Sequence, residues 1–246
     1  MSIQKKEIRL CVIIPTYNNA GTIGKVVEDV CSHCQHVIVV NDGCTDNTAA
    51  VLEGFKSRID VVSYGKNKGK GGALVAGFRR AIEKGYTHAV TIDADGQHFA
   101  DDMHVLIKEL ENNPEGIIVG ARNLNEENMP KGNTFANRFS NFWFTAYTGI
   151  LLPDTQTGFR LYPLRDLPSL KVVGSRYEAE LSLLLFSAWK GIRLIPVQVR
   201  VNYPRDRVTH FRPFQDFMRI TLVNIIGLPL AVFYGWPRIL LRKLFT

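Results

Sequence analysis

The first half of the chain alternates short apolar runs with amphipathic segments of helical spacing, and this alternation restricts the fold more than any other feature. The apolar runs are Arg9–Ile14, His36–Val40, Ile59–Tyr64, His88–Ile92 and Ile117–Val119. The segments between them are Thr22–Cys31, Asp46–Phe55, a stretch from Gly72 to Lys84, and Asp101–Glu111. Strands that are apolar throughout and alternate with amphipathic helices predict an α/β fold, with a mostly parallel central sheet flanked by helices.

The second half is less regular. It contains an aromatic, mixed stretch at Asn133–Leu152, an expected strand or extended turn at Asp154–Tyr162, an expected helix at Arg176–Lys190 and an expected strand at Ile192–Val201. From Pro213 onward the pattern is helical, apolar and basic. No linker separates two domains. We therefore expect one domain over residues 1–212 and a helical tail over residues 213–246.

Composition narrows the class of protein. The chain is 246 residues long, 46% hydrophobic and 22% charged, which suits a globular protein and excludes disorder. Its net charge of +7 suits an anionic partner, but no nucleic-acid-binding motif is present, so we expect no nucleic-acid partner. Cys31-Ser-His-Cys34 lacks a second ligand pair at zinc-finger spacing, so we interpret the four cysteines as buried thiols in a reducing compartment. No signal-peptide core follows Met1, which favours the cytoplasm.

Every polar cluster of the first half follows the end of a predicted strand. These clusters are Pro15-Thr-Tyr-Asn-Asn19, Asn41-Asp-Gly43, Lys66–Gly72 and Asp93-Ala-Asp-Gly-Gln-His98. In an open parallel sheet, ligands bind beyond the carboxyl ends of the strands. We therefore expect all four clusters to form one site that carries both signs of charge.

Asp93 and Asp95 are the most informative pair in that set. Two carboxylates this close repel each other unless a cation or a proton intervenes. Mg²⁺ usually takes one or two carboxylates together with substrate phosphates. The pair therefore predicts a divalent-cation site, to which Gln97 or His98 adds a ligand; two solvated turn aspartates are the alternative.

The segment Lys66-Asn-Lys-Gly-Lys-Gly-Gly72 lies between a predicted strand and a predicted helix, as phosphate-binding loops do. Glycines let backbone amides approach a ligand, and a helix N-terminus favours an anion. The spacing is not that of a Walker loop, and no G-x-G-x-x-G follows the first strand. The alternative is a flexible basic turn.

These clusters resemble the successive motifs of the family 2 glycosyltransferases. The motifs are Val12-Ile-Ile-Pro-Thr-Tyr-Asn18, Val39-Val-Asn-Asp-Gly-Cys-Thr-Asp46, Gly69-Lys-Gly-Gly-Ala-Leu74 and Asp93–His98. Val119-Gly-Ala-Arg122 and Asp154-Thr-Gln-Thr-Gly-Phe-Arg160 are similar to later motifs of the dolichyl-phosphate mannose synthase and dolichyl-phosphate glucosyltransferase group. The resemblance spans Leu10–Val201. It implies a GT-A fold and a nucleotide-diphosphate sugar donor, UDP- or GDP-linked, whose sugar is transferred with inversion.

The resemblance also implies roles for single residues. For the donor nucleotide these are Pro15, Tyr17, Asn18, Asp42, Lys70 and Asp93. For Mg²⁺ or Mn²⁺ they are Asp93, Asp95 and Gln97, with Asp95 and Arg122 as catalytic residues and Arg122, Arg138 and Arg160 as phosphate contacts. Asn18 stands where many members carry Glu, Asn41-Asp42 replaces paired aspartates, and Gly96 replaces a bulkier residue. Donor preference is therefore not carried over.

The acceptor side is open to two interpretations. A hydroxyl acceptor needs a general base, for which Glu178 and Glu180 are the candidates, whereas a phosphate acceptor is already an anion. The same glutamates also suit the N-terminus of a helix. In the resembling group, a basic loop after the last strand closes over the donor diphosphate and the acceptor phosphate. The matching candidates in this chain are Arg207, His210 and Arg212, and a solvated basic loop is the alternative.

The tail after Phe217 is apolar but too short and too broken to span a bilayer. Its aromatic residues, with Arg238, Arg242 and Lys243, predict amphipathic helices in the membrane interface; core packing or a dimer interface are the alternatives. We therefore expect a metal-dependent, inverting enzyme, peripheral on the cytoplasmic face of the membrane, that moves a hexose to a polyprenyl phosphate. The alternatives are a hydroxyl acceptor, such as a glycolipid, and a nucleotide-sugar-binding module without turnover.

Overall fold

The computed structural model describes residues 7–123, 131–165, 167, 177–202, 225 and 227–245. The strands are β1 (Leu10–Thr16), β2 (Val37–Asn41), β3 (Ile59–Ser63), β4 (His88–Thr91), β5 (Ile117–Ala121), β6 (Arg160–Pro163) and β7 (Leu194–Gln198). The helices are α1 (Ile23–His33), α2 (Thr48–Glu53), α3 (Gly69–Glu83), α4 (Met103–Asn112), α5 (Lys131–Thr148), α6 (Tyr177–Lys190) and α8 (Trp236–Phe245), with short helical segments η1 (Ala100–Asp102) and η3 (Ala231–Gly235).

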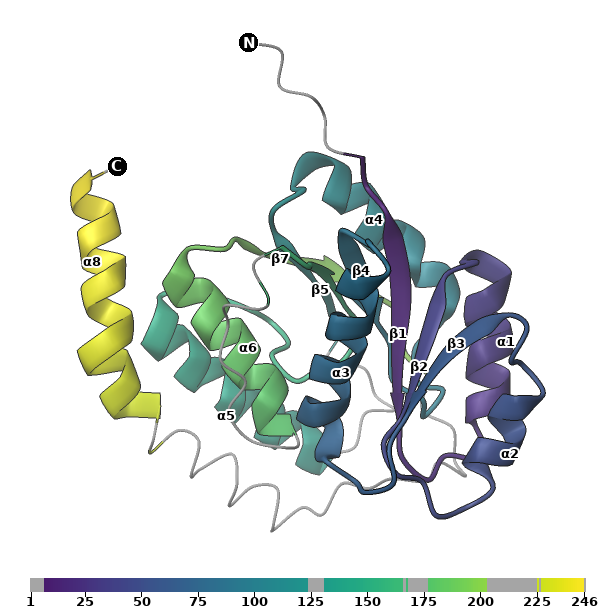
Figure 1. Ribbon diagram of the computed structural model, residues 1–246. Coiled ribbons are helices and arrows are strands. Elements are labelled where there is room, and N and C mark those ends of the chain that lie inside the picture. The colour runs from purple at the N-terminus through teal and green to yellow at the C-terminus, as the bar shows by residue number, and fades with distance from the viewer. Residues whose placement is uncertain are drawn as a thin grey trace.

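Within these described residues the strands form one seven-stranded sheet in the order β3-β2-β1-β4-β6-β5-β7. The first four strands pair in parallel, as do β5 and β7. β6 runs antiparallel to both of its neighbours, β4 and β5. The predicted α/β fold with a mostly parallel sheet flanked by helices is therefore confirmed (Figure 1).

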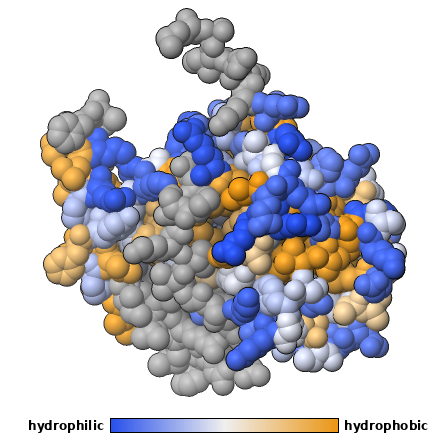
Figure 2. All heavy atoms as spheres, in the orientation of Figure 1, coloured by the Kyte–Doolittle hydropathy of each residue, from blue (hydrophilic) through white to orange (hydrophobic). Residues whose placement is uncertain are grey.

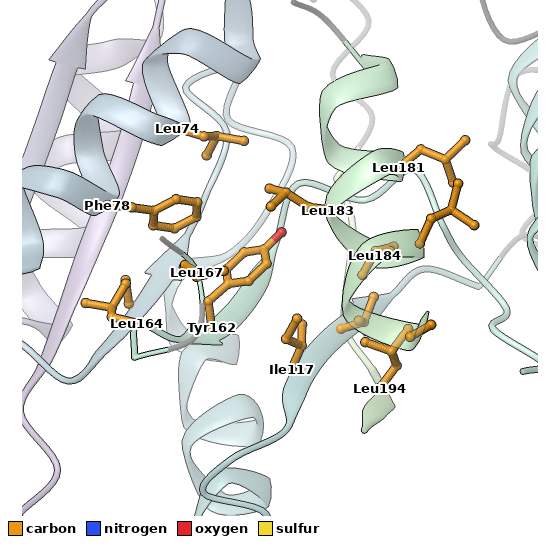
Figure 3. Packing of buried hydrophobic residues seen from close by; sticks show 14 of the residues in the cluster. Leu74, Phe78, Ile117, Tyr162, Leu164, Leu167, Leu181, Leu183, Leu184 and Leu194 are labelled. Atoms are coloured by element: carbon orange, nitrogen blue, oxygen red, sulfur yellow. The ribbon is translucent and has the colours of Figure 1, made fainter. Parts of the chain in front are cut away.

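Two apolar layers cover the sheet, one on each face. Helices α1 and α4 pack on one face, where Val27 and Leu106 are fully buried. Helices α3 and α6 pack on the other face (Figure 1). There, Tyr162 of β6 contacts Phe78 of α3, with 5.2 Å between ring centroids, and Figure 3 shows it lying between Phe78 and leucines of α6 such as Leu183. Burial on both faces explains why the parallel strands are apolar throughout.

The aromatic stretch after residue 131 forms the single helix α5, which the sequence pattern did not reveal. Its buried polar side chains bind the segment that precedes β6. Asn137 donates to the carboxylate of Asp154, and Ser140 exchanges a hydrogen bond with Thr155. Because polar residues face inward here and Phe142 is exposed, the helix lacks the usual apolar stripe that marks a helix against a core.

The C-terminal helix α8 confirms the expected helical tail and lies beside α5 and α6 (Figure 1). Gly235, just before it, packs against the indole of Trp189, where a Cβ atom would lie 2.4 Å from the ring. No helix in the part of the chain that the structure describes is long and apolar enough to cross a bilayer.

Candidate active site at the carboxyl edge of the sheet

The carboxyl ends of β1, β2 and β4 meet at one edge of the sheet, together with the N-terminus of α3, and bring the polar clusters together. Asp93 and Asp95 follow β4, and both are partly exposed at this edge. The chain turns at residues 94 and 95. The Asp95 carboxylate accepts hydrogen bonds from the backbone amide of Gln97 at 3.0 Å and from its side-chain amide at 2.7 Å. Burial, followed by the charge of Asp93, raises the pKa of Asp95 to about 6.

Lys70, in the first turn of α3, bridges two carboxylates from different elements. Its Nζ lies 2.7 Å from Oδ1 of Asp93 and 2.8 Å from Oε2 of Glu180, in the first turn of α6. Burial by itself would lower the pKa of Lys70, but the two carboxylates outweigh it and raise that pKa. Burial likewise favours a raised pKa for Asp93, yet the charge of Lys70 outweighs it and lowers the pKa. Residues 69–72 of the predicted Gly-Lys loop thus form the first turn of α3. Lys70 in this turn contacts the carboxylates of Asp93 and Glu180.

Asp154 lies behind the site and is fully buried. Its carboxylate accepts hydrogen bonds from Nε of Arg122 at 2.6 Å and from Nη2 at 3.1 Å, and it also accepts one from the Arg122 backbone amide. The Arg122 side chain is 13% exposed. The charge of Arg122 more than offsets burial and lowers the pKa of Asp154. Asp154 therefore fixes the guanidinium of Arg122 at the end of β5.

Gly158 packs directly on Asp93. A Cβ atom at this position would lie 2.5 Å from both carboxylate oxygens of Asp93. The hydroxyl of Thr91, at the end of β4, donates to the Gly158 carbonyl at 2.7 Å. The segment between Asp154 and Arg160 thus orients Arg122 at one end and borders the acidic pair at the other.

The loops after β1 and β2 are joined to each other. The Asn18 side chain accepts a hydrogen bond from the Thr45 amide at 2.8 Å, and Asn18 has a left-handed backbone with φ 53°. The Asp46 carboxylate accepts hydrogen bonds from the backbone amide of Thr48, at the start of α2, and from the backbone amide of Ala20. These contacts hold the two loops at fixed separation.

Asp42 is buried, and its Oδ1 accepts a hydrogen bond from the Lys68 backbone amide at 2.7 Å. Burial raises its pKa against the effect of that bond. The side chain therefore holds the loop that leads into α3 at the same edge. Of the other residues that the resemblance implied for the nucleotide, Tyr17 is 37% exposed and Pro15 is buried within β1.

Arg160 does not match the prediction of a phosphate contact. It is fully buried, and its guanidinium donates to the backbone carbonyls of Glu180 and Thr155 and to the hydroxyl of Tyr162. A charged residue that satisfies backbone carbonyls in the core is a structural tie between α6 and the segment before β6. Arg138, by contrast, is exposed on α5.

The two glutamates of α6 differ in environment. Glu178 is partly exposed, whereas the Glu180 side chain is 2% exposed and paired with Lys70. Burial raises the pKa of Glu180, and Lys70 opposes that effect. Both glutamates lie in the first turn of α6, as the helix-terminus alternative proposed. Arg207, His210 and Arg212 lie outside the described residues.

The fit of a divalent cation can be judged from the donor set. Among the described residues, no group of three or more His, Cys, Asp or Glu side chains is arranged to hold a metal ion. Asp93 and Asp95 nevertheless supply two carboxylates at one edge, and the side-chain amide of Gln97, which donates to Asp95 through Nε2, carries a further oxygen donor. Hard oxygen donors of this number suit Mg²⁺ or Mn²⁺ when substrate phosphates complete the coordination.

Sequence reasoning missed two contributors to this site: Asp154 as the partner of Arg122, and Gly158 as the neighbour of Asp93. His98 was named above as an alternative metal ligand. His98 is buried against Phe159, and burial lowers its pKa to about 4, so it is neutral at pH 7. The signal for Asp154 was present, because an acidic residue before an apolar strand in a basic chain needs a cationic partner. Only the fold identifies that partner as Arg122.

Comparison with known proteins gives three findings. The family model described as glycosyl transferase family 2 matches residues 11–166. A UDP-N-acetylglucosamine–dolichyl-phosphate N-acetylglucosaminyltransferase of Methanococcus voltae is 29% identical over 213 residues, which cover 78% of this chain and 85% of that protein. A dolichyl-phosphate beta-glucosyltransferase of Saccharomyces cerevisiae is 28% identical over 260 residues, 91% of this chain and 77% of that protein.

Among solved structures, the glucosyl-3-phosphoglycerate synthase of Mycobacterium tuberculosis, in complex with Mn²⁺, UDP and glucosyl-3-phosphoglycerate, superposes with a TM-score of 0.68. The match covers 91% of this chain and 80% of that one at 19% identity. The expected GT-A type of fold is therefore confirmed.

Proposed function

The chain belongs to glycosyl transferase family 2 and is a glycosyltransferase, and from that premise we propose that it moves a hexose from a nucleotide-diphosphate sugar to a polyprenyl phosphate. The observation that carries the proposal is the juxtaposition of Asp93 and Asp95 with the cations of Lys70 and Arg122 at one sheet edge. Such a site suits a diphosphate with a bound cation. Both curated relatives described above act on dolichyl phosphate by name, which supports a lipid-phosphate acceptor.

The donor diphosphate would lie between the acidic pair and Arg122, with the nucleoside toward Tyr17, Asn18 and Asp42. Asp93, Asp95 and Gln97 would hold Mg²⁺ or Mn²⁺. Such a cation supplies electrostatic stabilisation of the negative charge that gathers on a departing nucleoside diphosphate. The Arg122 guanidinium, held in place by Asp154, adds a fixed donor to the same oxygens. The panel of UDP- and GDP-sugars described below identifies the nucleobase of the donor, uracil or guanine.

Transfer with inversion is a single displacement at the anomeric carbon. An oxygen of the acceptor phosphate forms a bond to C1 of the sugar, the bond from C1 to the diphosphate oxygen breaks, and its electron pair leaves with the nucleoside diphosphate. A phosphate dianion or monoanion needs no general base. The burial of Glu180 and its pairing with Lys70 favour this acceptor, because a base must reach the acceptor hydroxyl. Glu178 is the candidate base if the acceptor is a hydroxyl.

The exposed surface of the C-terminal segment supports attachment to a membrane surface. Figure 2 shows apolar and hydrophilic side chains together along the outer side of α8. Its exposed apolar residues are Trp236, Leu240, Leu241 and Leu244, with Phe233 just before the helix. Exposed Arg238 and Arg242 lie on the same helix. We therefore propose that the tail lies in the interface of the cytoplasmic leaflet.

The function is tested with purified protein, polyprenyl phosphate, Mg²⁺ or Mn²⁺, and a panel of labelled UDP- and GDP-sugars. The expected result is label from one donor entering the organic phase only when a divalent cation is present. Metal-dependent donor hydrolysis without lipid label would move the acceptor to a hydroxyl compound. Donor binding without transfer or hydrolysis would contradict the proposal and leave a binding module.

Replacing Gly158 with alanine is expected to lower kcat by about 10²-fold, because a Cβ atom there would displace the Asp93 carboxylate, and ångström-scale misplacement has costs of this order. Steady-state transfer rates measure the effect, with the donor that the labelled panel identifies. The matched control is Gly21→Ala, since a Cβ atom at Gly21 meets nothing within 4 Å. Equal rates for the two variants would show that Gly158 does not set the position of Asp93.

A further inference from the structure

The ion cluster around Lys70 joins three elements that are distant in sequence. Its ammonium lies in the first turn of α3, between Asp93 at the end of β4 and Glu180 in the first turn of α6. The Lys70 side chain is 20% exposed, and the Asp93 side chain is 24% exposed, whereas Glu180 is almost completely enclosed. Asp93 is therefore the member of the cluster that a ligand from solvent can reach, and Glu180 is the member that it cannot.

The cations near the cluster differ in which carboxylate balances their charge. Arg122 is already balanced by the buried Asp154. Arg160 is buried against the backbone carbonyl of Glu180, so Glu180 is the carboxylate that faces both Arg160 and Lys70. Without the charge of Glu180, Asp93 would be the remaining carboxylate of the cluster that pairs with Lys70. Asp93 would then be held by Lys70 and would be a poorer ligand for a second cation.

We propose that Glu180 is a positioning residue for the divalent-cation site: it retains the ammonium of Lys70 when a divalent cation displaces that ammonium from Asp93. The proposal rests on the proposed function, since it assumes that Asp93 binds a divalent cation. In this arrangement Lys70 neutralises Asp93 before the cation arrives. After the cation has bound, Glu180 keeps the Lys70 ammonium at the first turn of α3, where the positive charge of Lys70 faces the donor diphosphate.

This role differs from that of a catalytic base. A base must contact the acceptor, and Glu180 is enclosed by the first turn of α3 and by Arg160 at the start of β6. Glu180 acts through Lys70 instead. Its effect should therefore appear in the affinity for the cation, in the absence of any acceptor, which a base would leave unchanged.

The test is a direct titration of the full chain with Mn²⁺, in which electron paramagnetic resonance measures free Mn²⁺, first without nucleotide and then with UDP or GDP. Glu180→Gln is expected to raise the Kd for Mn²⁺ roughly tenfold or more, because the site becomes one charge more positive. Lys70→Gln is expected to bind Mn²⁺ at least as tightly as the unmodified chain, since it removes the competing ammonium, while losing transfer activity.

The matched control for Mn²⁺ binding is Glu178→Gln, which removes the same charge from the same helical turn at a partly exposed position and should leave the Kd within about twofold. An unchanged Kd in Glu180→Gln, or weaker binding in Lys70→Gln, would overturn the proposal. If Glu180→Gln does not fold, as thermal melting would reveal, Lys70→Gln decides alone. If the unmodified chain binds no Mn²⁺ under any condition, the metal site of the proposed function fails; if it binds and the variants match it, only the role of Glu180 fails.

Discussion

Replacing Asp95 with asparagine is expected to lower kcat/KM for sugar transfer by about 10³-fold or more. Burial and the charge of Asp93 raise the pKa of Asp95, so its carboxylate is hard to ionise in the absence of a cation. A neutral amide keeps the size of the side chain but removes one of the two charges that would hold a divalent cation, and with it the stabilisation of the leaving diphosphate. Rates at saturating Mn²⁺, together with Mn²⁺ titration, separate weak metal binding from slow transfer.

Asp101→Asn provides the control for this substitution. Asp101 is exposed, follows the same loop along the chain, and shares Arg200 with Asp102, which keeps that arginine paired. Its rates should stay within about twofold of the unmodified chain. A rate for Asp95→Asn close to that of this control would remove Asp95 from the site.

Replacing Asp154 with asparagine is expected to lower the free energy of unfolding by about 3–5 kcal/mol at pH 7, the range observed when one partner of a buried ion pair is removed. Asp154 is fully buried and accepts hydrogen bonds from Arg122, Asn137 and the Gln156 amide. The substitution removes the carboxylate that holds the Arg122 guanidinium, so transfer should fall as well. Urea denaturation measures the first effect. A loss below about 1 kcal/mol would mean that the pair contributes little.

The pH dependence of this difference follows from the lowered pKa of Asp154. The unfolded chain binds a proton at this residue at higher pH than the folded chain does, so stability from ionised Asp154 is fully present above its unfolded pKa and is lost as pH falls toward the folded value. The gap between the unmodified chain and Asp154→Asn should therefore be widest near neutral pH and should narrow below about pH 4. A gap that widens on acidification would contradict the assignment.

The parts of the fold that were predictable are those in which local pattern and burial agree. The runs around Val12, Val39 and Val90 are apolar throughout because helices cover both faces of the sheet, and each became a parallel strand. The position of the polar clusters followed from the same rule, since parallel strands end at one edge. Helix α5 was not predictable, because its polar side chains, such as Asn137, are directed at Asp154 rather than at solvent.

The parts of the site that were not predictable depend on pairing across the fold. The family resemblance implied that Arg160 is a phosphate contact, yet Arg160 begins the buried strand β6 and donates to carbonyl groups. Glu180 was a candidate base because inverting enzymes usually supply a carboxylate on the acceptor side. In the structure it forms an ion pair with Lys70, which lies more than 100 positions earlier in the chain. Composition and spacing identify which side chains are ionic. They do not identify which opposite charge each one faces.

The antiparallel direction of β6 has a consequence for how this protein can diverge. β5 ends at the same sheet edge at which β6 begins, since Gly120 donates to the Phe159 carbonyl and Val119 pairs with Arg160. The described residues between β5 and β6, α5 among them, add no strand to the sheet. Changes in α5 that spare Asp154 and Gly158 would therefore leave the strand register intact, while β4 and Gly158 keep Asp93 in place.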